Sequence, residues 1–324
     1  MARKLVVSIK NMTDENWQHI ERAARDNGWT AEFYSKVEEA IEASRDAEVV
    51  FADTPDFVGH APDLKWMISP SAGVNHFTRS DAFMKSGVML SNSSGAYGVT
   101  ISEHIVMATL TMLRRIPEYE THIAAKNWFK SYFIKSIKGA RVTFLGTGDI
   151  GCETARKFKG FGPEKMTGVN TSGKVPADGE VGLFDEIAKV DDLAGVLPVT
   201  DILIMSLPYT PKTYRIMDEA ALGKLPEGAL IVNVGRGVCI DEEALIKMLK
   251  AGRLRAALDV FEKEPIPEDS ELWDCPNLLI TPHIAGDMFL KYTVDRIVEL
   301  FVEDFLRYVK GEKPERLVDL TKGY

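Results

Sequence analysis

Cysteine is scarce in this sequence, and the few cysteines present form no framework. Cys152, Cys239 and Cys275 are odd in number, and none of them lies in a Cys-x-x-Cys spacing. This usage indicates neither a set of disulfides nor a zinc site, so we expect no bound metal. A reducing compartment fits it best, and the expected location is therefore the cytoplasm.

Long apolar runs are also missing. The opening residues, MARKLVVSIKNM, include basic side chains but too few apolar ones for the core of a signal peptide. The longest apolar stretch, 101–113, contains Glu103 and His104 and is shorter than a membrane span. The sequence therefore predicts no membrane partner.

A basic surface is the third absence. The formal net charge is -9, and lysine and arginine form no dense cluster. Nucleic-acid binding needs a basic face, so the charge argues against such a partner but leaves small anionic ligands open. The remaining composition is typical of a globular chain, with 45% hydrophobic and 27% charged residues. A length of 324 residues suits two domains.

What the sequence does contain is a glycine motif behind a short apolar strand. Residues 141–151 read RVTFLGTGDIG, so that Gly146-x-Gly148-x-x-Gly151 follows the strand. In a dinucleotide-binding βαβ unit the first glycine permits a tight turn and the second lets the backbone approach a pyrophosphate. The third lets the next helix pack on the strand. Glycines with this spacing also occur in ordinary turns, but the strand before and the helical pattern after them favour a nucleotide site.

Short apolar runs alternate with helical patterns along the chain, which predicts α/β domains with parallel sheets. A long helix is expected over 98–116, stopped by Pro117, and another over 287–309 that returns to the first domain. Further helices are expected over 14–26 and 242–249, the latter with Gly252 as its cap. The expected strands are 5–9, 32–34, 48–52, 66–69 and 88–91 before the glycine motif, and six from it onward: 142–145, 166–169, 201–206, 229–234, 255–260 and 278–281.

Several loops follow the carboxyl ends of these strands, where open α/β sheets bind ligands. In the first region they are 52–55 and 70–75. In the second region Arg236, Glu264 and His283 each come just after a strand, so an anion binder, a carboxylate and a titrating imidazole would meet at one edge. Each has an ordinary alternative: a solvated turn residue, part of a charged surface run, and a hydrogen-bonded loop histidine. Their shared location favours the functional interpretation.

With these motifs in order, the chain resembles the D-isomer-specific 2-hydroxyacid dehydrogenase family over nearly its whole length. The resemblance implies a Rossmann-type doubly wound parallel sheet that binds NAD(P), over 99–287. It also implies a smaller flavodoxin-like α/β substrate domain built from both chain ends, 1–98 and 288–324. The matching segments are GTGDIG at 146–151, SLP at 206–208 with Thr213, NVGRG at 233–237, ALDV at 257–260 leading to Glu264-Pro265, and TPHIAG at 281–286.

The resemblance also implies roles for the candidate catalytic residues. Arg236 would bind the substrate carboxylate and keto oxygen, because a guanidinium fork is well shaped for them. His283 would be the acid-base, and Glu264 would orient it and favour its protonated form. Backbone donors at Ala72, Gly73 and Val74 would complete the carboxylate site.

The implied cofactor site is larger. Asp259 and the carbonyl group of Val234 would hold the nicotinamide carboxamide and so fix which face is presented. A homodimer joined through the cofactor domains is implied too, with the 98–116 helix and the arm over 119–134 at its interface. The full set of cofactor contacts would be Gly146, Gly148, Asp149, Ile150, Gly151, Asn170, Thr171, Ser172, Lys174, Leu207, Pro208, Thr213, Val234, Gly235, Asp259, His283 and Gly286.

Two positions depart from the family pattern. Asp149 puts a carboxylate near the expected pyrophosphate, which would weaken cofactor binding. Asn170 replaces the acid that an NAD site usually carries about 20 residues after the glycine loop. Asn170, Thr171 and Ser172 can donate to a 2′-phosphate and Lys174 can supply charge, so the loop favours NADPH over NADH. The alternative is a plain polar turn and an enzyme that accepts both.

The expected function is therefore the reduction of a small 2-oxo acid to a D-2-hydroxy acid, with glyoxylate, hydroxypyruvate and pyruvate homologues all open as substrates. The alternative from another class is a dinucleotide-responsive, corepressor-like binding protein with little turnover, which the intact Arg236, Glu264 and His283 disfavour. A formate-dehydrogenase-like activity would call for glutamine where Glu264 stands. A regulated phosphoglycerate dehydrogenase would need a further domain beyond Tyr324.

Overall fold

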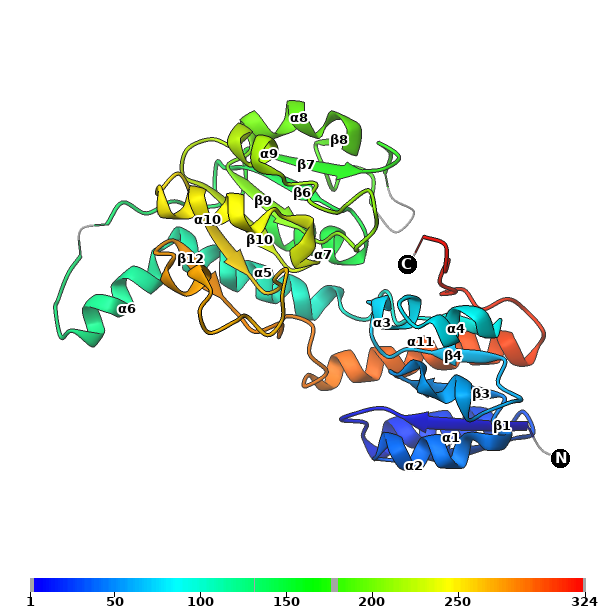
Figure 1. Cartoon of the computed structure of the whole chain (residues 1–324). Helices are drawn as coiled ribbons and strands as arrows, with labels where there is room; N and C mark the ends of the chain where they lie inside the picture. The colour runs from blue at the N-terminus through cyan, green and yellow to red at the C-terminus, as the bar shows by residue number, and fades with distance from the viewer. Residues whose placement is uncertain (1–2, 131, 176–179, 323–324) are drawn as a thin grey trace. The chain divides into compact units, whose positions relative to one another are not determined.

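The computed structural model describes residues 3–130, 132–175 and 180–322, which form two compact units. The first unit comprises Met1–Tyr97 together with Asp287–Tyr324, and the second is Gly98–Gly286 (Figure 1). Each unit is a parallel sheet with helices on its faces. No described helix is both long and apolar enough to cross a membrane.

The sheet of the first unit has five strands in the order β2-β1-β3-β4-β5, and every neighbouring pair is parallel. This is the flavodoxin-like order, in which the direction of winding reverses between β1 and β3. All five strands expected from the sequence are present. They are β1 (Arg3–Ser8), β2 (Trp29–Phe33), β3 (Val49–Ala52), β4 (Trp66–Ile68) and β5 (Met89–Ser91).

The C-terminal helix α11 (Lys291–Val309) packs on this N-terminal sheet, as expected. The ring of Phe301 stacks on Phe51 with 4.3 Å between centroids, and Phe305 meets Trp29 edge-on at 5.2 Å. The opposite face of the sheet is covered by a second apolar cluster. The other helices of this unit are α1 (Asp14–Arg25), α2 (Val37–Ala43), α3 (Asn75–Thr78) and α4 (Asp81–Ser86).

The sheet of the second unit is parallel throughout, in the order β12-β11-β10-β9-β6-β7-β8. The sequence predicted six strands, but the described chain has seven, because the edge strand β8 was missed. It is four residues long, begins and ends with a charged residue and has no buried residue. The strands are β6 (Arg141–Leu145), β7 (Lys165–Asn170), β8 (Glu186–Lys189), β9 (Ile202–Met205), β10 (Ala229–Asn233), β11 (Leu254–Leu258) and β12 (Leu278–Ile280).

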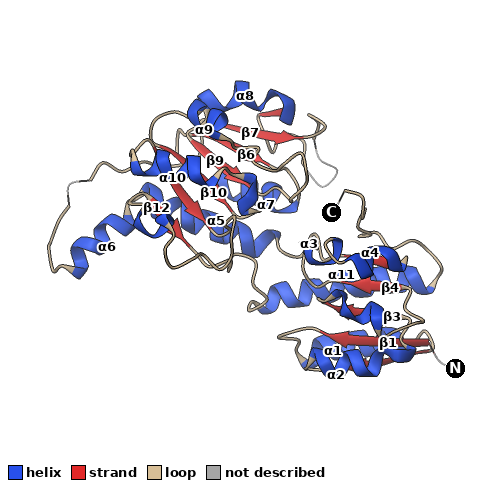
Figure 2. Cartoon of the chain, in the orientation of Figure 1, coloured by secondary structure: helices blue, strands red, loops and turns tan. Residues whose placement is uncertain are grey.

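Helices cover both faces of this sheet, which is the doubly wound arrangement that the sequence predicted (Figure 2). The order reverses between β6 and β9, and the glycine motif follows β6 directly, so the motif lies at the point where such sheets bind ligands. The helices are α5 (Gly98–Leu113), α6 (Ile116–Ala124), α7 (Asp149–Lys159), α8 (Leu193–Val196), α9 (Glu219–Lys224) and α10 (Glu242–Lys250).

The sequence predicted one helix over 98–116, and the predicted end of this helix is wrong. Helix α5 stops at Leu113, Arg115 takes a left-handed conformation with φ of 59°, and α6 begins at once. Pro117 therefore lies in the first turn of a new helix. Proline is tolerated there because the first N–H groups of a helix have no partner within it.

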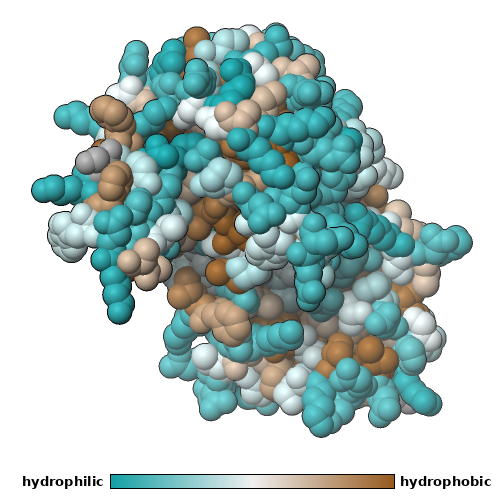
Figure 3. Space-filling model, turned by 60° about the vertical axis from the view of Figure 1, so that its left-hand side comes forward, coloured by the Kyte–Doolittle hydropathy of each residue, from teal (hydrophilic) through white to brown (hydrophobic). Residues whose placement is uncertain are grey.

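Helix α6 and the residues after it, 116–130 and 132–134, form a segment that we call the aromatic arm. Its base is fixed, because Glu118 accepts hydrogen bonds from Arg115 and from Arg255 on β11. Part of the arm packs on itself, but the side chains of Trp128 and Phe133 are 93% and 95% exposed. Figure 3 shows the molecule turned so that the left-hand side of Figure 1 comes forward. Hydrophobic residues, in brown and tan, form patches there among the hydrophilic residues in teal.

Candidate active site and cofactor site

The three candidate catalytic residues follow three neighbouring strands, as predicted. Arg236 comes after β10, Glu264 after β11 and His283 after β12, and these strands pair in parallel. Nδ1 of His283 lies 2.6 Å from Oε2 of Glu264. The turn that carries Arg236, residues 233–237, is called the Arg236 turn. It packs against the segment after β11, because a Cβ added at Gly237 would lie 1.9 Å from the carbonyl carbon of Phe261. The structure thus brings Glu264 and His283 into contact and sets the Arg236 turn against the segment that leads to Glu264.

Glu264 and His283 form an oriented pair. The other carboxylate oxygen of Glu264 accepts a hydrogen bond from the backbone N–H of Phe261 at 2.9 Å, which fixes the carboxylate plane. Glu264 contacts Nδ1, so Nε2 is the ring nitrogen turned away from it, and the His283 side chain is 52% exposed. His283 also has φ of 55°, a conformation that residues other than glycine rarely adopt. Such strain is found mainly at functional sites.

Asp259 holds the loop that carries His283. Its buried carboxylate accepts hydrogen bonds from the Thr281 hydroxyl at 2.6 Å and from the backbone N–H groups of Ile284 and Ala285, both at 2.9 Å. His104 on α5 also contacts the Thr281 hydroxyl, at 3.2 Å. Burial lowers the pKa of His104 and outweighs the opposite effect of Asp259, so this imidazole is neutral near pH 7. Sequence reasoning missed this loop-holding role of Asp259.

The Arg236 turn is shaped by Asn233, another contribution that sequence reasoning missed. The Asn233 amide donates to the carbonyl of Arg236 at 3.1 Å, and its oxygen accepts from the N–H of Gly235 at 3.0 Å. The guanidinium of Arg236 donates to the carbonyl of Gly235 at 2.7 Å. An asparagine two residues before Gly-Arg-Gly is a signal for such a turn, because its side chain can bond to the backbone two residues on.

The glycine loop fits a dinucleotide pyrophosphate. Gly146 has φ of 107°, and a Cβ at Gly151 would lie 2.1 Å from the carbonyl oxygen of Gly146. A Cβ at Gly148 would meet nothing within 4 Å, so space is open beside that residue. Helix α7 begins here without a side-chain cap at Gly148, and uncapped N–H groups at a helix start favour an anion.

The carboxylate of Asp149 contacts the start of helix α5, which the sequence did not reveal. A Cβ built at Gly98 would lie 2.5 to 2.8 Å from the carboxylate atoms of Asp149, so this carboxylate packs on the first residue of α5. The start of a helix stabilises negative charge. The charge expected to weaken cofactor binding is therefore offset within the protein.

The turn after β7 differs in one respect from the expected phosphate-binding role. The amide nitrogen of Asn170 donates to the Thr147 hydroxyl at 2.8 Å and to the Lys174 carbonyl at 2.9 Å, while its oxygen accepts from the N–H groups of Ser172 and Gly173. Both amide hydrogens are thus already used. Asn170 therefore shapes the turn and ties it to the glycine loop.

The loop after β9 is closed by its own threonine. The Thr213 hydroxyl donates to the Pro208 carbonyl at 2.7 Å and accepts from the N–H of Thr210 at 2.8 Å. A Cβ at Gly235 would lie 2.6 Å from the carbonyl oxygen of Leu207, so the loops after β9 and β10 touch. Thr213 therefore fixes the loop that carries Leu207 and Pro208.

In the first unit, Asp53 joins the two loops that the sequence singled out. Its carboxylate accepts hydrogen bonds from the hydroxyls of Ser69 and Ser71, and Nε2 of His76 lies 3.1 Å away. Burial opposes ionisation of Asp53, but these contacts together outweigh it and hold the pKa of Asp53 below its ordinary value. The Tyr97 hydroxyl also donates to the Pro70 carbonyl at 2.7 Å.

These contacts pin the loop that leads to Ala72, Gly73 and Val74. The Asn92 amide adds a hydrogen bond to the Ala72 carbonyl at 2.9 Å. Within the described part of the chain, no group accepts a hydrogen bond from the backbone N–H of Ala72, Gly73 or Val74. The loop is thus rigidly held while its donors stay available.

Comparison with known proteins agrees with this geometry. Residues 106–285 match the model of the D-isomer specific 2-hydroxyacid dehydrogenase NAD binding domain. The chain is 31% identical over 280 residues to a glyoxylate reductase of Thermofilum pendens, covering 85% of this chain and 78% of that protein.

Solved structures of proteins with the same fold match this chain over nearly its whole length. A D-isomer specific 2-hydroxyacid dehydrogenase family protein of Aeromonas salmonicida superposes with a TM-score of 0.84 at 29% identity, covering 99% of this chain and 100% of that one. An NADPH-dependent glyoxylate/hydroxypyruvate reductase of Sinorhizobium meliloti, in complex with NADP and sulfate, gives 0.80 at 26% identity, with 99% and 100% covered.

A doubly wound sheet with this glycine loop, and with an oriented histidine at the carboxyl end of another of its strands, defines an oxidoreductase with a nicotinamide dinucleotide cofactor. The chain belongs to the D-isomer specific 2-hydroxyacid dehydrogenase family.

Proposed function

We propose that this enzyme reduces a small 2-oxo acid to the D-2-hydroxy acid, with Arg236, Glu264 and His283 as its catalytic residues. The observation that carries the proposal is the 2.6 Å contact of Glu264 with Nδ1 of His283 at the strand edge that also bears the Arg236 turn. The names of the similar proteins, glyoxylate reductase and glyoxylate/hydroxypyruvate reductase, support small 2-oxo acids as the substrate class.

The residues divide the chemistry between them. A bound reduced nicotinamide supplies the hydride that reaches the carbonyl carbon. Nε2 of His283 gives a proton to the carbonyl oxygen, which completes the alcohol, and takes it back in the oxidative direction. Glu264 contacts Nδ1 and so orients the ring, which leaves Nε2 for the substrate. The guanidinium of Arg236 binds the substrate carboxylate and aligns the carbonyl.

The substrate and cofactor are held by the remaining candidate residues. The N–H groups of Ala72, Gly73 and Val74 supply further donors for the carboxylate. Asp259 keeps acceptor capacity beyond its three hydrogen bonds, since a carboxylate has about four acceptor sites, so it can still hold the carboxamide. We assign these residues a binding role and leave proton transfer to His283.

The cofactor that we propose is NADPH in preference to NADH. The turn from Asn170 to Lys174 carries no acid that would repel a 2′-phosphate, and the hydroxyl of Thr171 and the charge of Lys174 can receive one. The S. meliloti relative was crystallised with NADP, which supports the same preference. Asn170 acts here by shaping the turn.

The test is a panel of 2-oxo acids assayed with NADH and with NADPH, followed by chiral analysis of the product. We expect turnover of at least one small 2-oxo acid, a D product and a higher kcat/KM with NADPH. Asn170→Asp keeps the acceptor oxygen of the turn but adds charge, so it should lower the NADPH preference. Absence of turnover across the panel would favour the corepressor-like alternative, and a wild-type preference for NADH would refute the cofactor assignment alone.

A further inference from the structure

We infer that Lys189, on the edge strand β8, is the residue that discriminates the 2′-phosphate of the cofactor. The inference rests on the proposed NADPH preference and names the positive charge that this preference requires. Strand β8 pairs with β7, and in this pairing Lys189 stands opposite Asn170. Asn170 occupies the position at which an NAD site usually carries its acid. The last residue of β8 is therefore beside the place where the adenosine ribose binds.

The side chain of Lys189 lies along the turn itself. Gly173 has φ of 65°, and a Cβ built there would lie 2.7 Å from Cγ of Lys189 and 3.5 Å from its Cε. The aliphatic stem of Lys189 thus crosses the bare backbone of Gly173. This places the ammonium group next to a turn whose backbone is fixed by Asn170.

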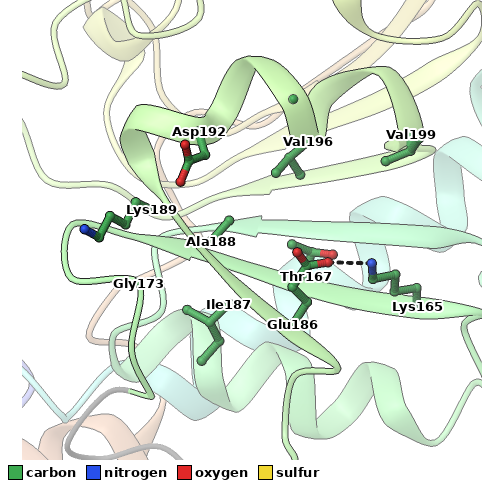
Figure 4. Close-up of a pocket in the computed structure, with 11 residues that line it drawn as sticks. Lys165, Thr167, Gly173, Glu186, Ile187, Ala188, Lys189, Asp192, Val196 and Val199 are labelled. Carbon is green, nitrogen blue, oxygen red and sulfur yellow. Dashed lines mark hydrogen bonds and ion pairs between the residues drawn. The ribbon is translucent and has the colours of Figure 1, made fainter.

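Lys189 also lines one end of a cavity of about 530 Å³ between β7, β8 and α8 (Figure 4). In Figure 4 its ammonium group points away from the other labelled side chains, while the ion pair of Lys165 with Glu186 lies at the opposite end. Asp192 lines the same cavity. Among the described residues, neither Asp192 nor any other carboxylate lies within 4.0 Å of the Lys189 ammonium group as an ion-pair partner. Its charge is thus available to a ligand.

The charge balance of the turn explains why a lysine is needed here. A phosphate monoester carries up to two negative charges and binds through charge-assisted hydrogen bonds. The amide of Asn170 is used within the turn, so hydroxyl groups and backbone N–H groups are its remaining neutral donors. Lys174 within the turn and Lys189 beside it then supply charge from two sides. Lys189 is the more constrained of these two, because its stem packs on Gly173.

The experiment measures binding of adenosine 2′,5′-bisphosphate and of 5′-AMP to the full-length protein by calorimetry. The two probes differ only in the 2′-phosphate. Lys189→Gln keeps the stem on Gly173 but removes the charge, so it should weaken the bisphosphate roughly 5- to 20-fold and leave 5′-AMP unchanged. Lys165→Gln, in the same cavity but at its other end, is the matched control and should change neither affinity.

Lys189→Glu should go further and reverse the preference, since it places a carboxylate opposite Asn170, where it would repel the 2′-phosphate. Equal weakening of both probes by Lys189→Gln, or no weakening of either, would overturn the inference while the NADPH preference stands. A wild-type protein that binds both probes equally would remove the cofactor preference and this inference together. The two failures are therefore distinguishable.

Discussion

His283 is positioned by its own side chain and by the loop that carries it. Glu264 fixes its Nδ1, Asp259 bonds to the loop on both sides of it, and its own backbone is left-handed. Each of these contacts limits the position of one ring nitrogen, Nε2. This is the preorganisation that proton transfer to a carbonyl oxygen requires.

The first prediction concerns this imidazole. His283→Ala should lower kcat by roughly 100- to 10,000-fold, because general acid-base catalysis is usually worth that much. Cofactor affinity, measured by fluorescence titration with NADPH, should stay within a few-fold of wild type. Glu264→Gln keeps a hydrogen-bond acceptor for Nδ1 without its charge, so it should retain intermediate activity. If His283→Ala kept wild-type kcat, the assignment of the acid-base would be wrong.

The candidate catalytic residues could be located from the sequence because each follows a strand that is apolar enough to recognise. The contacts of Asp259, Asn170 and Asp149 could not. Asp259 bonds to residues 22 to 26 positions further along the chain, and Asp149 packs on a helix that begins 51 residues before it, at Gly98. Such partners depend on how strands and loops are brought together, which local patterns do not encode.

Helices and strands show the same division between local and tertiary information. Buried strands such as β10, with five buried residues, were found because burial on both faces requires an apolar run. Strand β8 has no buried residue and is recruited by pairing with β7. The sequence predicts that Pro117 ends the preceding helix, because a proline interrupts a helical pattern. The left-handed Arg115 shows that the chain breaks earlier and that Pro117 lies in the first turn of the next helix.

Glu48 joins three elements of the first unit. It precedes β3, accepts two hydrogen bonds from Arg3 on β1 and one from Tyr308 on α11, and its side chain is only 13% exposed. The hydrogen bonds from Arg3 outweigh burial and, with help from Tyr308, lower the pKa of Glu48 to about 2. Its ordinary value is 4.5. The folded state therefore binds this proton more weakly than the unfolded state.

The second prediction follows from that difference in pKa. The contribution of Glu48 to stability is complete above pH 4.5 and is lost as the pH falls toward 2. Glu48→Gln should reduce the free energy of unfolding by about 1 to 2 kcal/mol near pH 7, a value discounted because Arg3 is partly exposed. The difference in Tm between variant and wild type should shrink at pH 3. Glu39→Gln, in an exposed pair with Lys36, is the control and should change little. A constant Tm difference from pH 7 to pH 3 would contradict the linkage.

The chain as a whole builds each sheet around one switch in strand order, and the sequence reveals this because strands and helices alternate in it. The first unit needs both chain ends, since Phe301 and Phe305 of α11 complete the core around Phe51 and Trp29. The second unit forms from one continuous segment, Gly98–Gly286. We propose that the former binds the substrate and the latter the cofactor, with the association of two chains as the remaining question.

The last prediction is that the protein is a homodimer joined through its cofactor units, with the aromatic arm at the interface. The arm is anchored to β11 through Glu118 and Arg255, so Trp128 and Phe133 are exposed on a fixed support. Burying a large apolar side chain stabilises by roughly 1.5 to 3 kcal/mol, and a two-fold interface buries each one twice. One chain has a mass of 36.0 kDa, and light scattering should give twice that mass.

The double variant Trp128→Glu with Phe133→Glu should be monomeric, because two carboxylates would have to be desolvated in each arm. Val181→Glu, which changes an equally exposed valine outside the arm, should leave the mass unchanged. A wild-type monomer at micromolar concentration, or a dimer that survives the double variant, would show that the exposed aromatic side chains of the arm do not hold two chains together.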